Sequence, residues 1–196
     1  MTLLSELGAI VLAAGLSSRM QGENKLLKVW RGKPLLAHCL ETVSALGLAH
    51  ICVVTGGNFE VRRLTATWPV TCVENPAFAT GMASSIAAGI LATPVSIVGA
   101  FIVLGDMPLV QGSDYDTLAA EFAPEHDRDI CVTMYKERRG HPVLFGKSHF
   151  PGLLALQGDR GGGELIVRNS ERVVRVQNAS QAVLRDFDTL EDFQNK

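Results

Sequence analysis

The 196-residue sequence has no hydrophobic stretch long enough to cross a membrane. Its longest apolar runs, residues 10–16 and 97–104, fall far short of the ~20 residues that span a bilayer. The N-terminus lacks the basic segment and the cleavage site of a signal peptide, and Glu6 interrupts it. We therefore expect a cytoplasmic protein with no membrane partner.

Cysteine is scarce, and its spacing matches neither a zinc site nor a disulfide framework. The four cysteines lie far apart in apolar segments, and no two of them form a C-x-x-C pair. Because cysteine is among the most frequently buried residue types, we expect free, buried thiols. The four are Cys39, Cys52, Cys72 and Cys131.

The sequence also lacks an excess of basic residues. It contains 18 Lys and Arg against 20 Asp and Glu, for a net charge of -2, and the basic residues are scattered. Nucleic-acid-binding proteins usually carry a basic stripe, so we expect no nucleic-acid partner. With 47% hydrophobic and 19% charged residues, the composition is that of a folded protein.

Two common nucleotide-binding motifs are absent. The sequence has no G-x-x-x-x-G-K-[ST] loop and no G-x-G-x-x-G after its first apolar run. These absences disfavour a P-loop NTPase and an ordinary dinucleotide-dependent dehydrogenase.

Short apolar runs alternate with helical patterns along the chain, which predicts a doubly wound α/β fold with a mostly parallel sheet. The length suits a single domain, 1–196, with a nucleotide-binding half at about 1–110 and an acceptor-binding half at about 111–196. We expect strands at 9–13, 51–55, 70–74, 97–104, 130–135, 141–145 and 173–176, and helices at 34–45, 59–66, 82–91, 115–122, around Leu153, around Leu165 and from about Thr189.

One strand is expected to run against the others. The runs at 130–135 and 141–145 are separated only by the polar turn KERRG, a spacing typical of a hairpin. The sheet should therefore contain one antiparallel strand.

The polar loop after the first strand suits a polyphosphate ligand. In open α/β sheets, ligands bind beyond the carboxyl ends of the strands. Gly15 allows a sharp turn there, and the amides of Ser17 and Ser18 can point at an anion. Arg19 and Lys25 add positive charge. The same loop is also compatible with a plain turn whose basic residues face solvent.

Carboxylates follow the apolar run FIVLG and recur near the C-terminus. Asp106 at the end of a strand can hold Mg²⁺ against phosphate oxygens, or it can form a turn before Pro108. Asp186 and Asp188 offer two further carboxylates, although Asp188 with Thr189 also suits a helix cap.

The stretch LAAGLSSRMQGENKLL resembles the nucleotide-binding signature L-A-[AG]-G-x-S-x-R-M-G of the molybdopterin-type nucleotidyltransferases, followed by their Asn-Lys-Leu-Leu-like stretch. ENPAFATGMASSIAAGI, VLGDMPLV, GHPVLF, GDRGGGELI and DFDTLEDF occur in the family's order over nearly the whole chain. The resemblance implies a Rossmann-like fold and transfer of a nucleotidyl group from a nucleoside triphosphate to the phosphate of molybdopterin or the molybdenum cofactor, with release of pyrophosphate. Mg²⁺ is the implied metal, and a molybdenum hydroxylase is a client protein to expect.

Alanine at position 14, in place of a second glycine, resembles the cytidylyl branch of the family more than the guanylyl branch. We therefore expect CTP rather than GTP as the nucleotide.

The resemblance also implies roles for individual residues. Arg19, Lys25 and Asp106 are the expected catalytic residues, Asp106 and Asp188 the metal ligands, and His141 and Asp159 the acceptor-binding residues. His141 could equally be a half-buried strand histidine, Ser84 a plain helix-start residue and Asp159 a solvent-facing loop residue. The expected nucleotide-binding residues are Leu12, Ala13, Ala14, Gly15, Ser17, Ser18, Arg19, Lys25, Asn75, Gly81 and Ser84.

The chain departs from the signature at Gln21, which stands where the family has glycine after Arg-Met. A side chain at that position can keep the backbone from approaching phosphate. Gln21 therefore keeps open a non-catalytic protein that binds and delivers molybdenum cofactor. Independently, the same fold could act on another small phosphorylated acceptor such as a sugar phosphate.

Overall fold

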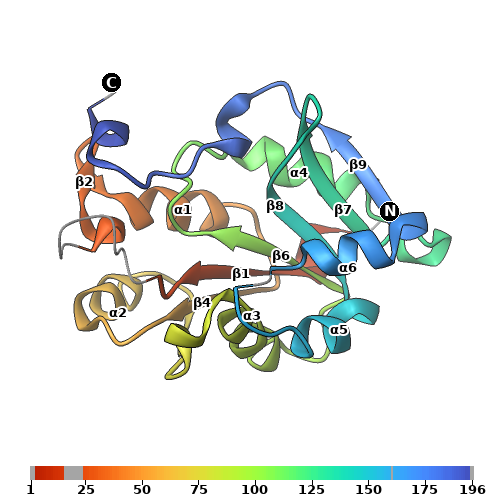
Figure 1. Ribbon diagram of the computed structural model, residues 1–196, viewed down its shortest axis with the longest axis horizontal. Helices are drawn as coiled ribbons and strands as arrows, with labels where there is room; N and C mark the ends of the chain where they lie inside the picture. The colour runs from red at the N-terminus through yellow and green to blue at the C-terminus, as the bar shows by residue number, and fades with distance from the viewer. Residues whose placement is uncertain (1–2, 16–23, 160, 195–196) are drawn as a thin grey trace.

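A single seven-stranded β-sheet runs through the computed structural model, which describes residues 3–15, 24–159 and 161–194 (Figure 1). The strands lie in the order β5, β4, β1, β6, β8, β7, β9. In chain order they are β1 (Leu7–Ala13), β4 (His50–Thr55), β5 (Thr71–Glu74), β6 (Gly99–Leu104), β7 (Ile130–Tyr135), β8 (Arg138–Gly146) and β9 (Val173–Gln177).

Strand β8 is antiparallel to both of its neighbours, β6 and β7, whereas the other neighbouring pairs of this sheet are parallel. The predicted fold class, a mostly parallel α/β sheet with one antiparallel strand, is confirmed. The hairpin is tighter than the expected KERRG turn: Tyr135 pairs with Arg138, so only Lys136 and Glu137 form the turn. Lys136 takes the positive φ of 54° that such a short connection needs.

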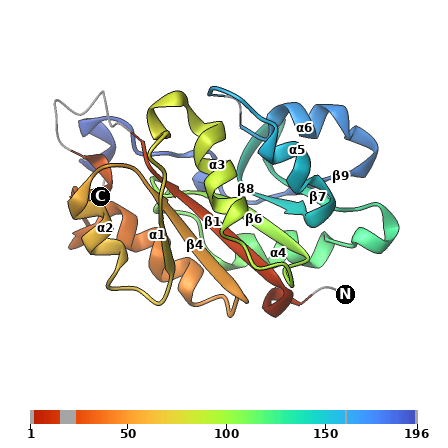
Figure 2. The ribbon, with the colours of Figure 1, turned by 90° about the horizontal axis from the view of Figure 1, so that it is seen from below.

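Helices cover both faces of the sheet. One hydrophobic cluster joins the sheet to α1, α2 and α4, and a second joins its other face to α3, α5 and α6. Figure 2 shows α3, α5 and α6 on the side turned to the viewer. The helices are α1 (Leu35–Ser44), α2 (Phe59–Thr65), α3 (Met82–Leu91), α4 (Gly112–Glu121), α5 (Phe150–Leu154) and α6 (Gly163–Arg168).

Burial on both faces explains why the central strands read as continuous apolar runs. In β1, Ala9 and Val11 pack on the α1 and α4 side, while Ile10 packs on the α3 side, and all three are almost fully buried. Across the described segments, no helix combines the length and the hydrophobicity that a membrane crossing needs.

A small hairpin that the sequence did not predict precedes α1. Strands β2 (Val29–Trp30) and β3 (Lys33–Pro34) are joined by Arg31 and Gly32, both with positive φ. Pro34 therefore belongs to this hairpin, and α1 begins one residue later than expected.

The expected C-terminal helix is only one short 3₁₀ turn, Leu190–Phe193. The Asp192 carboxylate accepts hydrogen bonds from the backbone amides of Asp188 and Thr189, at 3.0 and 2.8 Å. The cap signal at Thr189 was therefore real, but it precedes a turn that is too short to form an α-helix.

The expectation of four buried thiols is wrong for Cys72, which is exposed. Cys72 lies in β5, at the edge of the sheet, where no strand covers the outer side. Cys39, Cys52 and Cys131 are buried as expected.

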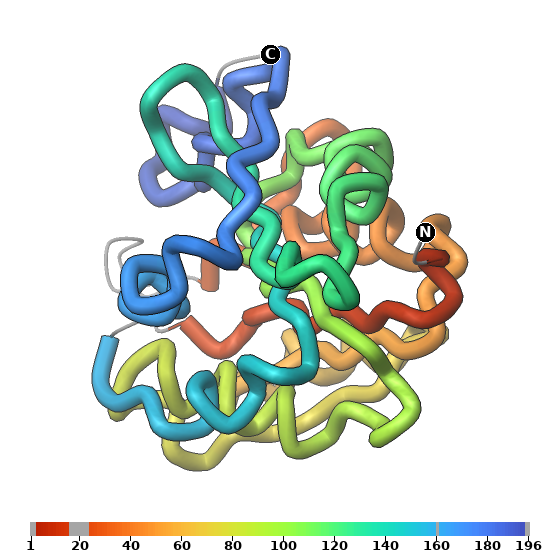
Figure 3. Tube along the Cα trace, turned by 90° about the vertical axis from the view of Figure 1, so that its right-hand side faces the viewer, coloured from red at the N-terminus to blue at the C-terminus, as the bar shows by residue number. Residues whose placement is uncertain are grey.

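The C-terminal part of the chain passes beside the β7–β8 hairpin (Figure 3). The 3₁₀ turn Gln181–Leu184 lies against it. A Cβ atom at Gly140 would come within 2.3 Å of the Val183 carbonyl oxygen, so this close approach requires glycine. The chain then passes from this turn to residues 186–188.

A buried ionic cluster centred on Asp129 joins the starts of β7 and β9 to the end of β8. Asp129 is 1% exposed, and its carboxylate accepts hydrogen bonds from Ser148 Oγ at 2.6 Å, His149 Nε2 at 2.8 Å and Arg172 Nη2 at 2.6 Å. Burial alone would raise the pKa of Asp129, but the hydrogen bonds from Arg172, Ser148 and His149 lower it to about 2.

We predict that Asp129→Asn lowers the free energy of unfolding by about 2 kcal/mol at pH 7, because the buried carboxylate gives up its charge-assisted hydrogen bonds from Arg172, which keeps its ion pair with Asp127. In the wild type, the lowered pKa contributes about 2 kcal/mol that is fully present above the ordinary pKa of 3.8 and is lost as the pH falls toward 2. Urea unfolding between pH 7 and pH 2.5 measures both effects. The exposed Asp116→Asn is the control, and equal stability of Asp129→Asn and wild type would refute the prediction.

Candidate functional site

The chain changes direction across the sheet between β1 and β6, and this is where a doubly wound fold places its ligand cleft. From β1 the chain continues to β4 on one side, and β6 lies on the other. Gly105, directly after β6, donates its amide to the Leu12 carbonyl oxygen at 3.1 Å, and a Cβ atom there would lie 3.0 Å from the same oxygen. The glycine therefore keeps Asp106 close to the end of β1.

The predicted nucleotide-binding residues at the end of β1 are only partly described. Leu12 and Ala13 end the strand, Ala14 is 8% exposed, and Gly15 is exposed, with no atom of another described residue within 4 Å of where a Cβ would lie. Ser17, Ser18, Arg19 and also Gln21 lie outside the described residues, so their expected roles stay predictions.

Phe187 anchors the C-terminal segment beside Asp106. Its amide donates to the Asp106 carbonyl oxygen at 3.0 Å, and its ring is buried against Trp30 and Phe193, with centroids 5.1 and 5.5 Å away. Successive side chains of an extended segment point to opposite sides. The buried ring at 187 thus turns its two acidic neighbours toward the cleft.

Lys25 lies between two of the carboxylates. Its Nζ is 2.5 Å from Asp106 Oδ2 and also forms an ion pair with Asp188 Oδ1. Lys25 begins a short 3₁₀ turn that Asn24 caps, because the Asn24 side chain accepts a hydrogen bond from the Leu26 amide at 3.0 Å. The structure thus brings together three of the predicted residues from distant parts of the chain.

The negative charges of Asp106 and Asp188 stabilise the positive charge of Lys25. Burial alone would lower the pKa of Lys25, but the negative charges and hydrogen bonds of Asp106 and Asp188 raise it above its usual value. Lys25 therefore carries a full positive charge at neutral pH.

Three carboxylates could hold a metal ion here. Asp106, Asp186 and Asp188 each offer one oxygen, and these oxygens lie within 4.8 Å of one another. Asp106 Oδ1 is buried and has no hydrogen-bond partner among the described residues, so it is an acceptor that suits a cation or a donor. Oxygen ligands of this kind suit Mg²⁺ or Mn²⁺. The sequence named Asp106 and Asp188 as ligands, and the structure adds Asp186 to the same cluster.

His141, predicted to bind the acceptor, lies on β8 close to the acidic cluster. Burial lowers its pKa, while a backbone hydrogen bond with Ile102 and the charges of Asp106 and Asp186 oppose that shift. Its Nδ1 atom is buried and has no hydrogen-bond partner within the part of the chain that the structure describes. A neutral imidazole with an unused nitrogen is thus present beside the carboxylates.

Asn75 and Ser84 form a second group at the start of α3. Asn75 is 4% exposed, and its side-chain amide donates to Ser84 Oγ at 2.8 Å and to Ser85 Oγ at 3.1 Å. Ser84 Oγ in turn lies 2.8 Å from the Gly81 carbonyl oxygen. These hydrogen bonds stabilise the loop before α3, so Asn75 and Ser84 have a structural role in addition to the nucleotide contact that the sequence predicts.

Gly81 lets the loop that contains Gly158 and Asp159, the latter predicted to bind the acceptor, pack against the start of α3. Its φ is +118°, and a Cβ atom there would lie 2.3 Å from the Gly158 carbonyl carbon. The Ala83 amide also donates to the Gly158 oxygen at 3.0 Å. Asp159 follows Gly158 and is exposed. Asp159 therefore lies beside the α3 group, whereas His141 lies beside the carboxylates.

Sequence reasoning missed the residues that position the site. Phe187 is recognisable afterwards from the pattern Asp-Phe-Asp, in which one apolar residue between two acids marks a half-buried extended segment. The packing of Gly81 on Gly158 joins segments far apart in the chain, and no local pattern signals it.

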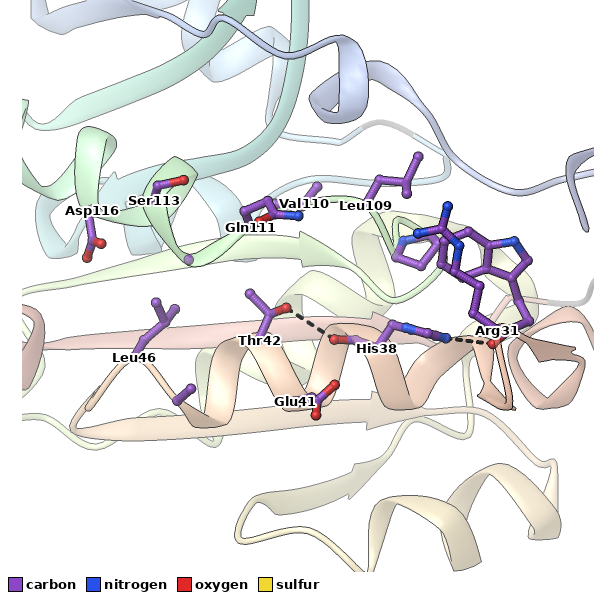
Figure 4. A pocket seen from close by; sticks show the side chains of 14 residues that line it. Arg31, His38, Glu41, Thr42, Leu46, Leu109, Val110, Gln111, Ser113 and Asp116 are labelled. Carbon is purple, nitrogen blue, oxygen red and sulfur yellow. Dashed lines mark hydrogen bonds between the residues drawn. The ribbon is translucent and has the colours of Figure 1, made fainter. Parts of the chain in front are cut away.

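A separate hollow of about 580 Å³ lies between α1 and the β6–α4 connection (Figure 4). His38 Nε2 donates a hydrogen bond to the Trp30 carbonyl oxygen at 2.8 Å, and Thr42 Oγ1 donates to the His38 carbonyl oxygen. None of the predicted site residues that the structure describes lines this hollow, so we do not assign the chemistry to it.

The fold is that of a nucleotidyltransferase. A nucleotidyl transferase from Methanothermobacter thermautotroptrophicus superposes with a TM-score of 0.82 at 20% identity, covering 96% of this chain and 94% of the other.

The chain belongs to the MobA-like NTP transferase family, whose domain matches residues 9–173. It is 27% identical over 192 residues to molybdenum cofactor cytidylyltransferase of Escherichia coli, covering 97% of this chain and 95% of that protein. It is also 32% identical over 169 residues to bifunctional protein GlmU of Lactococcus lactis, covering 83% of this chain. The chain spans only about a third of the length of such GlmU proteins, 33% in this case.

We predict that Gly81→Ala lowers the free energy of unfolding by about 2 kcal/mol, because the new methyl group meets the Gly158 backbone at a φ that disfavours alanine. Gly163→Ala is the matched control, since its Cβ would meet no atom within 4 Å and should change stability by less than about 0.5 kcal/mol. Urea unfolding of both variants measures the difference. Equal stabilities would show that the loop does not depend on this contact.

Proposed function

We propose that the protein is a molybdenum cofactor cytidylyltransferase, which transfers CMP from CTP to the phosphate of molybdopterin or the molybdenum cofactor and releases pyrophosphate. The observation that carries the proposal is the similarity to the Escherichia coli enzyme over nearly the full length of both chains. The gathering of Lys25 with three carboxylates at the β1–β6 cleft supports nucleotidyl transfer as the chemistry. The expected setting is the cytoplasm, and the expected client is a molybdenum hydroxylase.

In this proposal the acceptor phosphate attacks the α-phosphorus of CTP directly, so no side chain needs to act as nucleophile. The backbone at Ala14 and Gly15 approaches the triphosphate, and the Lys25 ammonium offsets the charge that develops on the pyrophosphate leaving group. Catalysis is then mainly positioning and charge stabilisation. Ser17, Ser18 and Arg19 keep the phosphate-binding roles that the signature implies.

The carboxylate cluster fits a divalent metal ion, since Asp106 Oδ1 is a buried acceptor with no partner in the described segments and the other donors are oxygens. Asp106 and Asp188, with Asp186 within reach, would hold Mg²⁺. Bound there, the ion would supply positive charge that offsets the negative charge of the reacting phosphates.

The base and the acceptor are assigned to adjoining parts of the cleft, because Gly158 and Asp159 lie against Gly81. Ala14 favours CTP over GTP, while Asn75, Gly81 and Ser84 at the start of α3 would face the sugar or base. His141 and Asp159 would contact the acceptor. The proximity of His141 to Asp106 supports an acceptor phosphate close to the metal.

The similarity to GlmU proteins supports a second candidate, in which the same fold acts on another small phosphorylated acceptor such as a sugar phosphate. The third alternative, a non-catalytic protein that delivers molybdenum cofactor, differs from both because it releases no pyrophosphate.

A pyrophosphate-release assay separates these candidates. CTP, GTP and ATP are each supplied with Mg²⁺ and either molybdenum cofactor or a panel of sugar phosphates. We expect release only with molybdenum cofactor, and faster release with CTP than with GTP or ATP. Release with a sugar phosphate instead would favour the second candidate, and no release with any pair would contradict both enzymatic functions.

The same assay can be run on one test variant and one control variant. Asp106→Asn should lower turnover by about 100-fold or more, because it removes a charged ligand from the reacting phosphates. The exposed Asp116→Asn, on α4, should leave turnover unchanged. If Asp106→Asn kept full turnover in a folded protein, the assigned cluster would not be the active site.

A further inference from the structure

The Lys25 ammonium occupies the space among the carboxylates that a divalent ion would need. Its Nζ lies 2.5 Å from Asp106 Oδ2 and pairs with Asp188 Oδ1. The ligand oxygens of Asp106, Asp186 and Asp188 are all within 4.8 Å of one another. An ion bound to these three carboxylates would therefore lie only a few ångströms from Nζ.

The distances at the cluster bear on whether the Lys25 ammonium and a divalent ion can both bind the carboxylates. Mg²⁺ binds oxygens at about 2.0–2.1 Å, which is shorter than the separation of Lys25 Nζ from Asp106 Oδ2. An ammonium and a divalent ion that share the same carboxylates repel each other strongly in a partly buried site, where water screens poorly. The side chains of Lys25 and Asp106 are only 13% and 18% exposed. This repulsion disfavours binding of both cations unless another anion arrives.

The charges around Lys25 indicate which kind of anion could replace the carboxylates as its partner. Among the described groups of the cluster, Lys25 is the cation and Asp106, Asp186 and Asp188 are the anions, while burial favours the neutral form of His141 by lowering its pKa. A nucleoside triphosphate brings several negative charges on oxygens that both an ammonium and a metal ion can bind. It would give Lys25 a new partner at the moment the metal takes the carboxylates.

We propose that Lys25 is an internal counter-ion that closes the carboxylate cluster to divalent metal until a nucleoside triphosphate binds. The inference rests on the proposed function, since it takes the cluster as the metal site of the nucleotidyl transfer. Metal and triphosphate then bind with positive coupling, each raising the affinity for the other by the same factor. Without nucleotide, the metal must displace Lys25 and binds weakly.

The test measures Mn²⁺ binding to the nucleotide-free protein by the loss of the free-ion signal in electron paramagnetic resonance. Lys25→Met keeps most of the side-chain volume and removes the charge, and we expect it to bind Mn²⁺ at least about tenfold more tightly than wild type. Lys25→Gln, a second neutral variant, should show the same gain and covers the case in which Lys25→Met does not fold. Lys33→Met is the matched control, because it removes a lysine that pairs with Glu41 away from the cluster, and it should bind Mn²⁺ like wild type.

Asp106→Asn separates failure of this inference from failure of the proposed site. If Asp106→Asn abolishes Mn²⁺ binding while the Lys25 variants bind no more tightly than wild type, the metal site stands and the role of Lys25 as counter-ion is refuted. If neither Asp106→Asn nor the Lys25 variants change Mn²⁺ binding, the cluster is not the metal site and both proposals fail. Tighter binding in the Lys25 variants, lost again on adding Asp106→Asn, supports the inference.

Discussion

The contact of Lys25 with Asp106 and Asp188 is the interaction on which the site depends. It joins a loop near the N-terminus, the end of a central strand and the C-terminal segment. Each of these segments is positioned by a different part of the fold. The ion pairs are partly buried, so the arrangement persists only where the surrounding packing holds all three side chains in reach.

That packing depends on small residues at close approaches and on one aromatic anchor. Gly105 lets the end of β6 lie against β1, and Gly140 lets the 3₁₀ turn Gln181–Leu184 lie on the hairpin. Phe187 then fixes the segment between Asp186 and Asp188 by its burial beside Trp30. A chemical site of four charged side chains thus rests on apolar contacts and glycines that carry no charge themselves.

Sequence reasoning predicted the sheet and the site to different extents. The apolar runs in β1 and β6 are buried on both faces, so their strands, and the position of Asp106 after one of them, could be predicted from the pattern alone. The hairpin of β2 and β3, the exposure of Cys72 and the packing of Gly81 on Gly158 could not, because each depends on what lies across from the residue in space. Asp186 was recognised only as an alternative to Asp188, since spacing alone does not show that both face the same cleft.

The most direct test of the account is a crystal structure with CTP and Mn²⁺, in which anomalous scattering locates the metal. The account predicts Mn²⁺ bound by Asp106 and Asp188 at the carboxyl end of β6, with Lys25 moved from the carboxylates to the phosphates. Mn²⁺ bound elsewhere, with Lys25 still bridging Asp106 and Asp188, would contradict it.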